Sequence, residues 1–286
     1  MKVLILCNTA ATFNPVANWL LDHGHEVRMI MNSVWDLGRC TQDHPAGIVT
    51  DSARSFYKVS IQQIKQFKPD VIHVSSSIKM LVLARLYAPR TPIVFSYHGS
   101  EVRGRKKRHY EAKLADVVTV STPDLQQYGV WYDRPVEACF YYRGSREPNT
   151  AFMLYNDNFI LDQREFARQW CKERCIKLTI LDRSEPGHVT VPYYQMPFLY
   201  SKYEYYLDFK GHIGRQYALS KAAMEAFACG CKVIHEEGQV ENIKFPDPDE
   251  YYRLYDSLKR SSVWGTLKRI PVLVYGLTRT LLGLKQ

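Results

Sequence analysis

The sequence predicts an α/β protein of two units, each built on a parallel sheet. Apolar runs of strand length alternate with segments of helical periodicity, which is the order expected for parallel strands covered by helices. This alternation occurs twice, on either side of a turn-rich stretch at residues 143–149. The chain has 286 residues, of which 46% are hydrophobic, enough for two cores.

The first half of the chain begins with a buried strand. KVLILCN at 2–8 is a short apolar run, and residues 15–23 follow it with apolar side chains at helical spacing. The same alternation continues, with strands expected at 25–32, 70–76, 91–99 and 116–122 and helices at 60–67 and 79–87. These segments predict one parallel sheet with helices on both faces.

The second half repeats the pattern after the turn-rich stretch. Strands are expected at 151–156, 176–182, 204–209 and 232–236, with helices at 162–173 and 220–229. We therefore expect a first domain at 1–145, a second at 146–263 and a C-terminal helix at 264–286. Because open α/β sheets bind ligands outside the carboxyl ends of their strands, we expect the site in a cleft between the domains.

The C-terminal stretch mixes apolar residues with Lys268, Arg269 and Arg279. It is too short for a membrane span and is interrupted by Pro271. A helix packed across the two domains is one interpretation, and a surface helix that dips into lipid is the other.

The cysteines and the net charge predict the cellular compartment and the kind of partner. The seven cysteines are scattered, which does not suit a disulfide framework and favours a reducing compartment. The first apolar run ends at Asn8, as a strand would, so we expect a cytoplasmic protein, with the inner membrane face as a candidate peripheral location. A net charge of +9 favours an anionic partner. No aromatic segment of nucleic-acid-binding type accompanies the basic residues, so no nucleic acid is expected.

Three segments resemble a known enzyme family. FKPDVIHVS at 67–75, TPIVFSYHGSE at 91–101 and SKAAMEAFACGCKVI at 220–234 resemble, in order and rough spacing, retaining GT-B glycosyltransferases of family 4. The resemblance implies two Rossmann-like domains with parallel sheets that face an interdomain cleft. It also implies glycan biosynthesis by hexosyl transfer from a nucleotide-diphosphate sugar to a hydroxyl acceptor, with retention. Lipid-linked and glycan acceptors are both candidates.

The third segment makes physical sense as a diphosphate site. Ser220 predicts a helix N-cap, and the backbone N–H groups after it, together with the helix dipole, favour an anion. Glu225 is expected on an outward face, and the resemblance implies that it binds the ribose hydroxyls. Tyr217 stands where the family has a glutamate that contacts the donor sugar. Arg215 and Lys221 flank the helix start and are expected to neutralise the diphosphate.

In the first domain, His98 ends an apolar strand and is expected to face the cleft. The resemblance implies that His98 contacts the donor sugar and stabilises charge near the anomeric carbon, which makes His98 and Glu225 the candidate catalytic residues. The alternative is that His98 only bonds the turn that follows it. His73, inside VIHVS, is expected to be a buried and satisfied strand residue.

Loops at the strand ends complete the expected site. Asn8 and Thr9 follow the first strand and should face the diphosphate, although the paired glycines usual there are missing. Glu101 should lie on the acceptor side. The acceptor or membrane side also includes a basic run, made of Arg103, Arg105, Lys106, Lys107 and Arg108.

Neither a metal nor a cofactor is expected, and the nucleotide sugar is the donor substrate. The cysteines have no C-x2-C spacing, and no H-E-x-x-H motif is present. Two other functions stay open. Tyr217 favours a catalytically degenerate GT-B-like protein that binds a nucleotide or glycan, and His98 is the ionisable side chain that a GT-B sugar epimerase would use.

Overall fold

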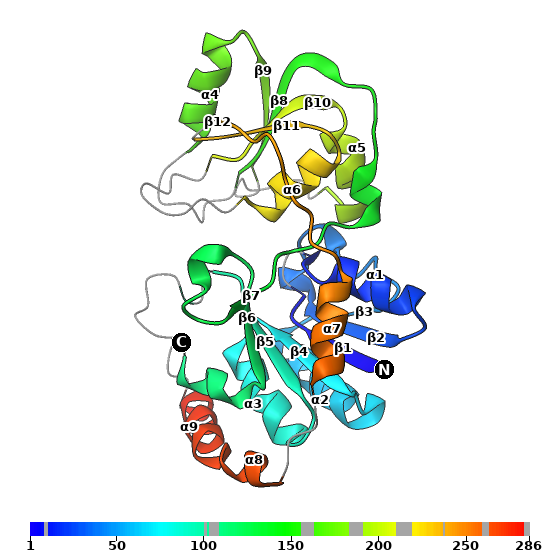
Figure 1. The fold of residues 1–286 in the computed structure, drawn as a ribbon, viewed down its shortest axis with the longest axis vertical. Helices are drawn as coiled ribbons and strands as arrows, with labels where there is room; N and C mark the ends of the chain where they lie inside the picture. The colour runs from blue at the N-terminus through cyan, green and yellow to red at the C-terminus, as the bar shows by residue number, and fades with distance from the viewer. Residues whose placement is uncertain are drawn as a thin grey trace. The chain divides into compact units, whose positions relative to one another are not determined.

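The structure of the protein is a computed structural model, and it describes residues 1–8, 11–99, 102, 109–155, 163–182, 191–209, 219–236, 238–258 and 263–282. The chain forms two compact units, drawn in Figure 1. The first combines Met1–Pro135 with Asp247–Gln286, and the second is Val136–Pro246. These boundaries differ from the expected 145/146 and 263/264, because the chain returns to the first unit at Asp247.

The first unit is built on a seven-stranded sheet in the order β3-β2-β1-β4-β5-β6-β7. All its neighbouring strands pair in parallel. The strands are β1 (Lys2–Leu6), β2 (Glu26–Asn32), β3 (Gly47–Thr50), β4 (Val71–Ser75), β5 (Ile93–Tyr97), β6 (Val117–Val120) and β7 (Val130–Trp131). From β1 the chain adds β2 and β3 on one side, and then β4 to β7 on the other. The sheet therefore has a topological switch point at the carboxyl ends of β1 and β4.

Successive side chains of β1 pack into two different hydrophobic cores. Val3 and Ile5 join a core with residues of α1 and α7, whereas Leu4 and Leu6 join the other core, with residues of α2, α3 and α9. The helices of this unit are α1 (Asn14–Asp22), α2 (Ala53–Phe67), α3 (Ile78–Tyr87), α7 (Asp249–Ser257), α8 (Val263–Leu267) and α9 (Ile270–Leu281). The sheet is therefore covered on both faces, as the alternation predicts.

The C-terminal segment explains the shifted boundary. Tyr251, Leu254 and Tyr255 of α7 are buried in the same core as Val3 and Ile5, and Figure 1 shows α7 beside α1. Helix α9 packs on α3 and on a short 3-10 turn, η4 (Tyr110–Leu114). It thus belongs to the first unit rather than crossing between two domains, which corrects that interpretation. Among the helices of the described residues, none has the length and apolar character to span a bilayer.

The second unit carries a five-stranded sheet in the order β12-β11-β10-β8-β9. Its strands are β8 (Glu147–Tyr155), β9 (Lys177–Asp182), β10 (Tyr203–Leu207), β11 (Lys232–His235) and β12 (Gly238–Gln239). Strand β12 is antiparallel to β11, so the expected parallel arrangement covers the other four strands. The helices are α4 (Gln163–Glu173), α5 (Met196–Tyr200) and α6 (Lys221–Ala228). The switch point of this sheet lies between β8 and β10.

Candidate functional site

Three residues at the carboxyl edge of the first sheet have a positive φ. Cys7 follows β1 with φ 65°, Ser76 follows β4 with φ 61°, and Gly99 follows the end of β5 with φ 137°. Left-handed backbone at a residue other than glycine costs about 1–3 kcal/mol and clusters at functional sites. Because these strands include both sides of the switch point, this edge is the candidate site of the first unit.

His98 lies at this edge, directly after β5. Its Nε2 forms a 2.7 Å hydrogen bond with the Ser75 hydroxyl at the end of β4. Its ring is also 6.0 Å from the ring of Phe13, edge to face. The residue is half-buried. The imidazole is therefore oriented by a neighbouring strand rather than only by its own turn.

His73 lies below this edge and is fully buried, as expected. Its Nδ1 lies 2.6 Å from the Tyr255 hydroxyl of α7, and its Nε2 lies 2.6 Å from the Ser96 hydroxyl of β5. Burial, with a smaller contribution from His98, lowers the pKa of His73 well below its usual value. His73 is thus a neutral, satisfied strand residue, and that prediction is confirmed.

Phe13 connects α7 to both histidines. Its ring lies 4.1 Å from His73, 6.0 Å from His98 and 5.7 Å from Tyr251 of α7. Sequence reasoning misses this support because it predicts no helix at α7. The buried tyrosines at 251 and 255, with Leu254 between them, have the helical spacing that could have revealed it.

Asn8 shapes the loop after β1. Its Oδ1 accepts a hydrogen bond from the Phe13 N–H at 3.0 Å, and its Nδ2 donates to the Asn14 Oδ1 at 2.6 Å and the Thr41 Oγ1 at 3.3 Å. The Asn8 side chain is fully buried and its amide bonds within the protein, and the contact of this loop with a diphosphate stays a prediction. The remaining first-domain candidates lie outside the described residues: Thr9, Glu101, Arg103, Arg105, Lys106, Lys107 and Arg108.

In the second unit, Ser220 caps α6 as the sequence predicts. Its Oγ accepts a 3.0 Å hydrogen bond from the Ala223 N–H. The Ser220 N–H and hydroxyl donate in turn to the two carboxylate oxygens of Asp208, at 3.0 and 2.7 Å. Asp208 directly follows β10 at the switch point, so the protein's own carboxylate lies at the start of α6, near the expected diphosphate position. The sequence analysis places Asp208 inside the expected strand at 204–209, and its position directly after the apolar run at 205–207 was the available signal.

Lys221 and Glu225 form a buried pair on α6. Lys221 Nζ lies 3.3 Å from Glu225 Oε1, and both side chains are less than one-tenth exposed. The Tyr193 hydroxyl donates to Glu225 Oε1 at 2.9 Å and accepts from Lys221 Nζ at 3.1 Å. Burial, with Glu225 and Glu137 nearby, raises the pKa of Tyr193 well above its usual value, so the phenol stays protonated.

The orientation expected for Glu225 is therefore wrong. Positions four residues apart share a helix face, and here that face packs against Tyr193 instead of pointing outward. The ribose-binding role itself stays a prediction, as do the roles of Ser220 and Lys221. Arg215 and Tyr217 lie outside the described residues.

No group of three metal-ligating side chains occurs in the part of the chain that the structure describes. The sequence contains an Asp-x-Asp pair, Asp247 and Asp249, at the start of α7, and the Asp249 carboxylate forms a 2.9 Å ion pair with Arg253. Metal independence stays a prediction.

Comparisons with known proteins agree with this architecture. The model of Glycosyltransferase Family 4 matches residues 15–137. No curated protein matches the chain. A candidate UDP-N-acetylglucosamine 2-epimerase from Listeria monocytogenes is 13% identical, with a TM-score of 0.53 over 97% of this chain and 90% of that one. The S. aureus protein MnaA, solved with UDP, is 14% identical, with a TM-score of 0.51 over 90% of this chain and 87% of that one.

At these identities the solved structures show the fold. The chain has the GT-B fold, with an α/β sheet of mostly or wholly parallel strands in each unit. All but the last two residues of the family match lie in the first unit, where it spans β4, which ends at Ser75, and β5, which His98 directly follows. The chain is thus a GT-B-fold protein whose residues 15–137 are similar to Glycosyltransferase Family 4.

Proposed function

We propose that the protein is a retaining, metal-independent glycosyltransferase that moves a sugar from a nucleotide-diphosphate sugar to a hydroxyl acceptor. The observation that carries this proposal is the family match over residues 15–137. It includes the half-buried His98, held at 2.7 Å by Ser75 beside the switch point of the sheet. In the proposed reaction His98 contacts the donor sugar and stabilises charge that develops near the anomeric carbon.

Donor binding in the second unit is proposed to involve the start of α6. Ser220 and the first turn of the helix would face the diphosphate, together with Arg215, which lies outside the described residues. Because the Ser220 N–H and hydroxyl donate to the Asp208 carboxylate, their contact with the diphosphate requires Asp208 to move away. Lys221 and Glu225 form an ion pair, and both bond the Tyr193 hydroxyl. A direct contact of either side chain with the donor therefore requires this buried pair to separate. Otherwise the pair acts by holding α6 in place.

UDP sugars are the first donors to test, because a protein of the same fold was solved with UDP. Acceptors are proposed to be lipid-linked or glycan hydroxyls, reached at the cytoplasmic face of a membrane. A sugar epimerase is the second candidate, supported by the epimerase name of the Listeria protein, which shares the fold.

A thermal-shift panel of nucleoside diphosphates and their sugars tests the proposal. A ligand at one hundred times its Kd stabilises the folded state by about 2.7 kcal/mol, so a true donor raises the Tm. Analysis of products in the presence of hydroxyl acceptors then distinguishes the functions. A transferase releases the nucleoside diphosphate and forms a glycoside on the acceptor, an epimerase returns an altered nucleotide sugar, and a degenerate binder returns the donor unchanged. His98→Ala should abolish turnover, whereas His23→Ala, at an exposed histidine of the same unit, should not.

A further inference from the structure

Exposed apolar side chains line most of the outward face of α9, with the exposed Thr278 among them. On α9, Ile270 is 47% exposed, Val274 56% and Tyr275 45%. Leu282, just after α9, is 66% exposed, and Leu267, at the end of α8, is 45% exposed. The spacing of three and four residues places these side chains in one stripe. A contiguous exposed apolar face of this kind marks an interaction surface.

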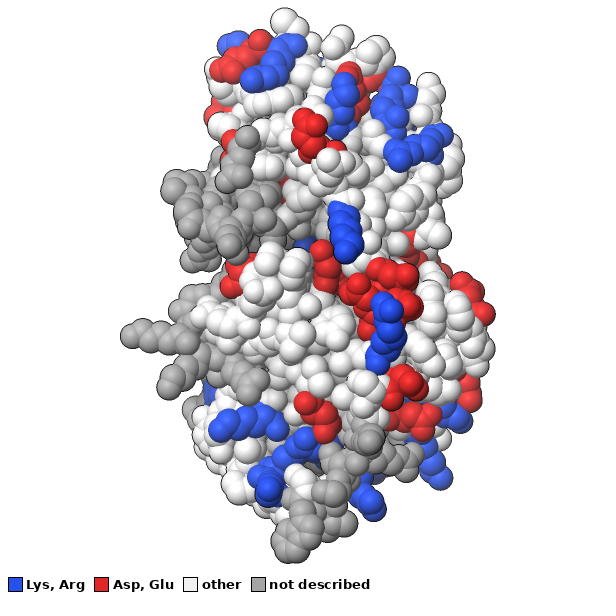
Figure 2. Space-filling model, viewed as in Figure 1, with Lys and Arg blue, Asp and Glu red and all other residues white. Residues whose placement is uncertain are grey.

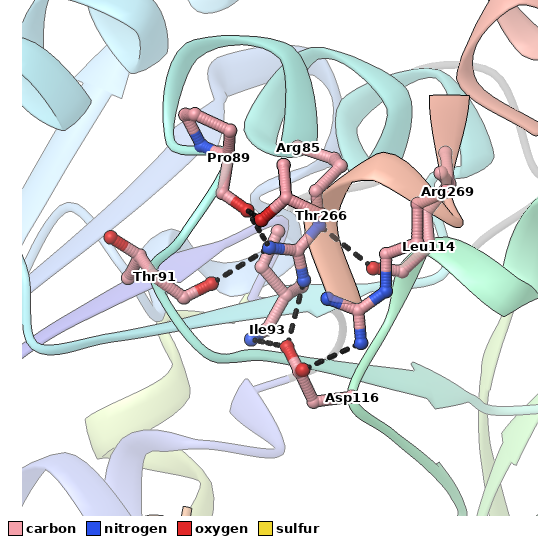
Figure 3. Close-up of polar contacts among 8 residues, drawn as sticks. All are labelled: Arg85, Pro89, Thr91, Ile93, Leu114, Asp116, Thr266 and Arg269. Atoms are coloured by element: carbon pink, nitrogen blue, oxygen red, sulfur yellow. Dashed lines mark hydrogen bonds and ion pairs between the residues drawn. The ribbon is translucent and has the colours of Figure 1, made fainter. Parts of the chain in front are cut away.

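Arg269, just before α9, and Arg279, near its end, pair with carboxylates of the first unit, and the Arg279 guanidinium also lies 5.9 Å from the ring of Tyr275. Arg269 donates to the Asp116 carboxylate at 2.7 Å, and Arg279 donates to the buried Glu111 carboxylate at 3.0 Å. Figure 3 shows Arg269 and the buried Arg85 converging on Asp116. An ordinary surface helix has the opposite arrangement, with charges outward and apolar residues inward.

These ion pairs hold α9 firmly. Burial raises the pKa of Asp116, but the Ile93 N–H, Arg85 and Arg269 outweigh it and hold the pKa below its usual value. Gly276 brings the helix close to α3, since a Cβ at this position would lie 2.7 Å from a methyl group of Val82. The apolar stripe is therefore presented by an anchored helix.

The sequence around the stripe is basic. Residues 257–286 contain six Lys and Arg and no Asp or Glu. Lys268 is exposed beside the stripe, and Lys113 of η4 lies over the ring of Tyr110, which contacts Tyr275 at 5.2 Å. Figure 2 shows blue side chains gathered where Figure 1 places α8 and α9. The basic run that ends at Arg108 directly precedes η4 in the sequence.

We propose that the outer face of α9, with Lys268 and Lys113, binds the surface of an anionic lipid bilayer. Apolar side chains enter the interface while the basic side chains contact acidic headgroups. A second copy of the chain fits less well, because a symmetric contact through this face would bring like charges together. The inference names a partner for the proposed transferase, and the binding itself does not depend on transfer.

Vesicle co-sedimentation of the full chain tests this proposal, with phosphatidylcholine vesicles that contain or lack phosphatidylglycerol. The chain should bind the anionic vesicles, and added salt should weaken the binding because it screens the charges. The double variant Ile270→Ser, Val274→Ser should bind at least about tenfold more weakly. Lys268→Glu should weaken binding to anionic vesicles by about fivefold or more.

The matched control is Val34→Ser, which makes the same change at a 71% exposed valine elsewhere on the first unit and should leave binding unchanged. A thermal melt of each variant establishes that it is folded. Equal binding by the double variant and the parent would overturn the proposal. So would a dimer in analytical ultracentrifugation that the double variant converts to a monomer. Nucleotide-sugar binding, measured without vesicles, reports on the proposed function separately.

Discussion

Tyr255→Phe tests whether α7 supports the candidate site through His73. The variant keeps the aromatic ring, so it opens no large cavity, but it removes the hydroxyl that lies 2.6 Å from His73 Nδ1. His73 is fully buried, and no water can replace the lost partner without rearrangement of the core. The change therefore isolates one hydrogen bond.

The expected destabilisation follows from that burial. A buried polar atom left without a partner costs about 1–3 kcal/mol. For a unit of this size, 1 kcal/mol shifts the Tm by roughly 2–4 °C. The Tm of the first unit should therefore fall by roughly 2–12 °C. Calorimetry and urea unfolding at neutral pH measure both quantities.

The matched control is Tyr252→Phe, on the same helix but half-buried. It should change the free energy of unfolding by less than about 0.5 kcal/mol, as surface substitutions do. If Tyr255→Phe is as stable as the parent chain, the inferred support of the site by α7 is wrong.

Other consequences can be measured in the same way. Lys221→Met leaves Glu225 buried without its cation and should destabilise the second unit by about 3–5 kcal/mol in urea unfolding. The double variant Lys221→Met, Glu225→Gln should recover part of that loss in the free energy of unfolding. Burial lowers the pKa of His44 to about 4 and holds the pKa of His73 well below its usual value, so the unfolded chain takes up protons first below pH 6.5. Stability should therefore fall from pH 6.5 toward pH 5 by up to about 1.4 kcal/mol per pH unit for each histidine, and a flat profile of urea midpoints would contradict this. Gly276→Val should destabilise the first unit by about 1–3 kcal/mol in thermal melts, because α9 lies too close to α3 for a larger side chain.

Strong periodicity makes most of this fold predictable from the sequence. The apolar runs at 2–8, 70–76 and 91–99 correspond to β1, β4 and β5, since strands buried on both faces read as continuous apolar segments. Strand β3 is missed because it has four residues and is mostly half-buried. Helix α7 is missed because its polar residues outnumber the three that it buries.

Side-chain direction at the candidate site is less predictable. The burial of His73 follows from its place inside an apolar strand. The contacts of Asn8 with Thr41 and of Glu225 with Tyr193 join residues about thirty positions apart, and no local pattern encodes them. The domain boundary at Asp247 is likewise set by tertiary packing of α7 on the first unit.

Product analysis with UDP sugars tests the proposed transfer most directly. With hydroxyl acceptors present, the account predicts release of UDP and formation of a glycoside whose anomeric configuration matches that of the donor, both lost in His98→Ala. Recovery of an epimerised sugar still attached to UDP would contradict it, as would donor that binds but is never consumed.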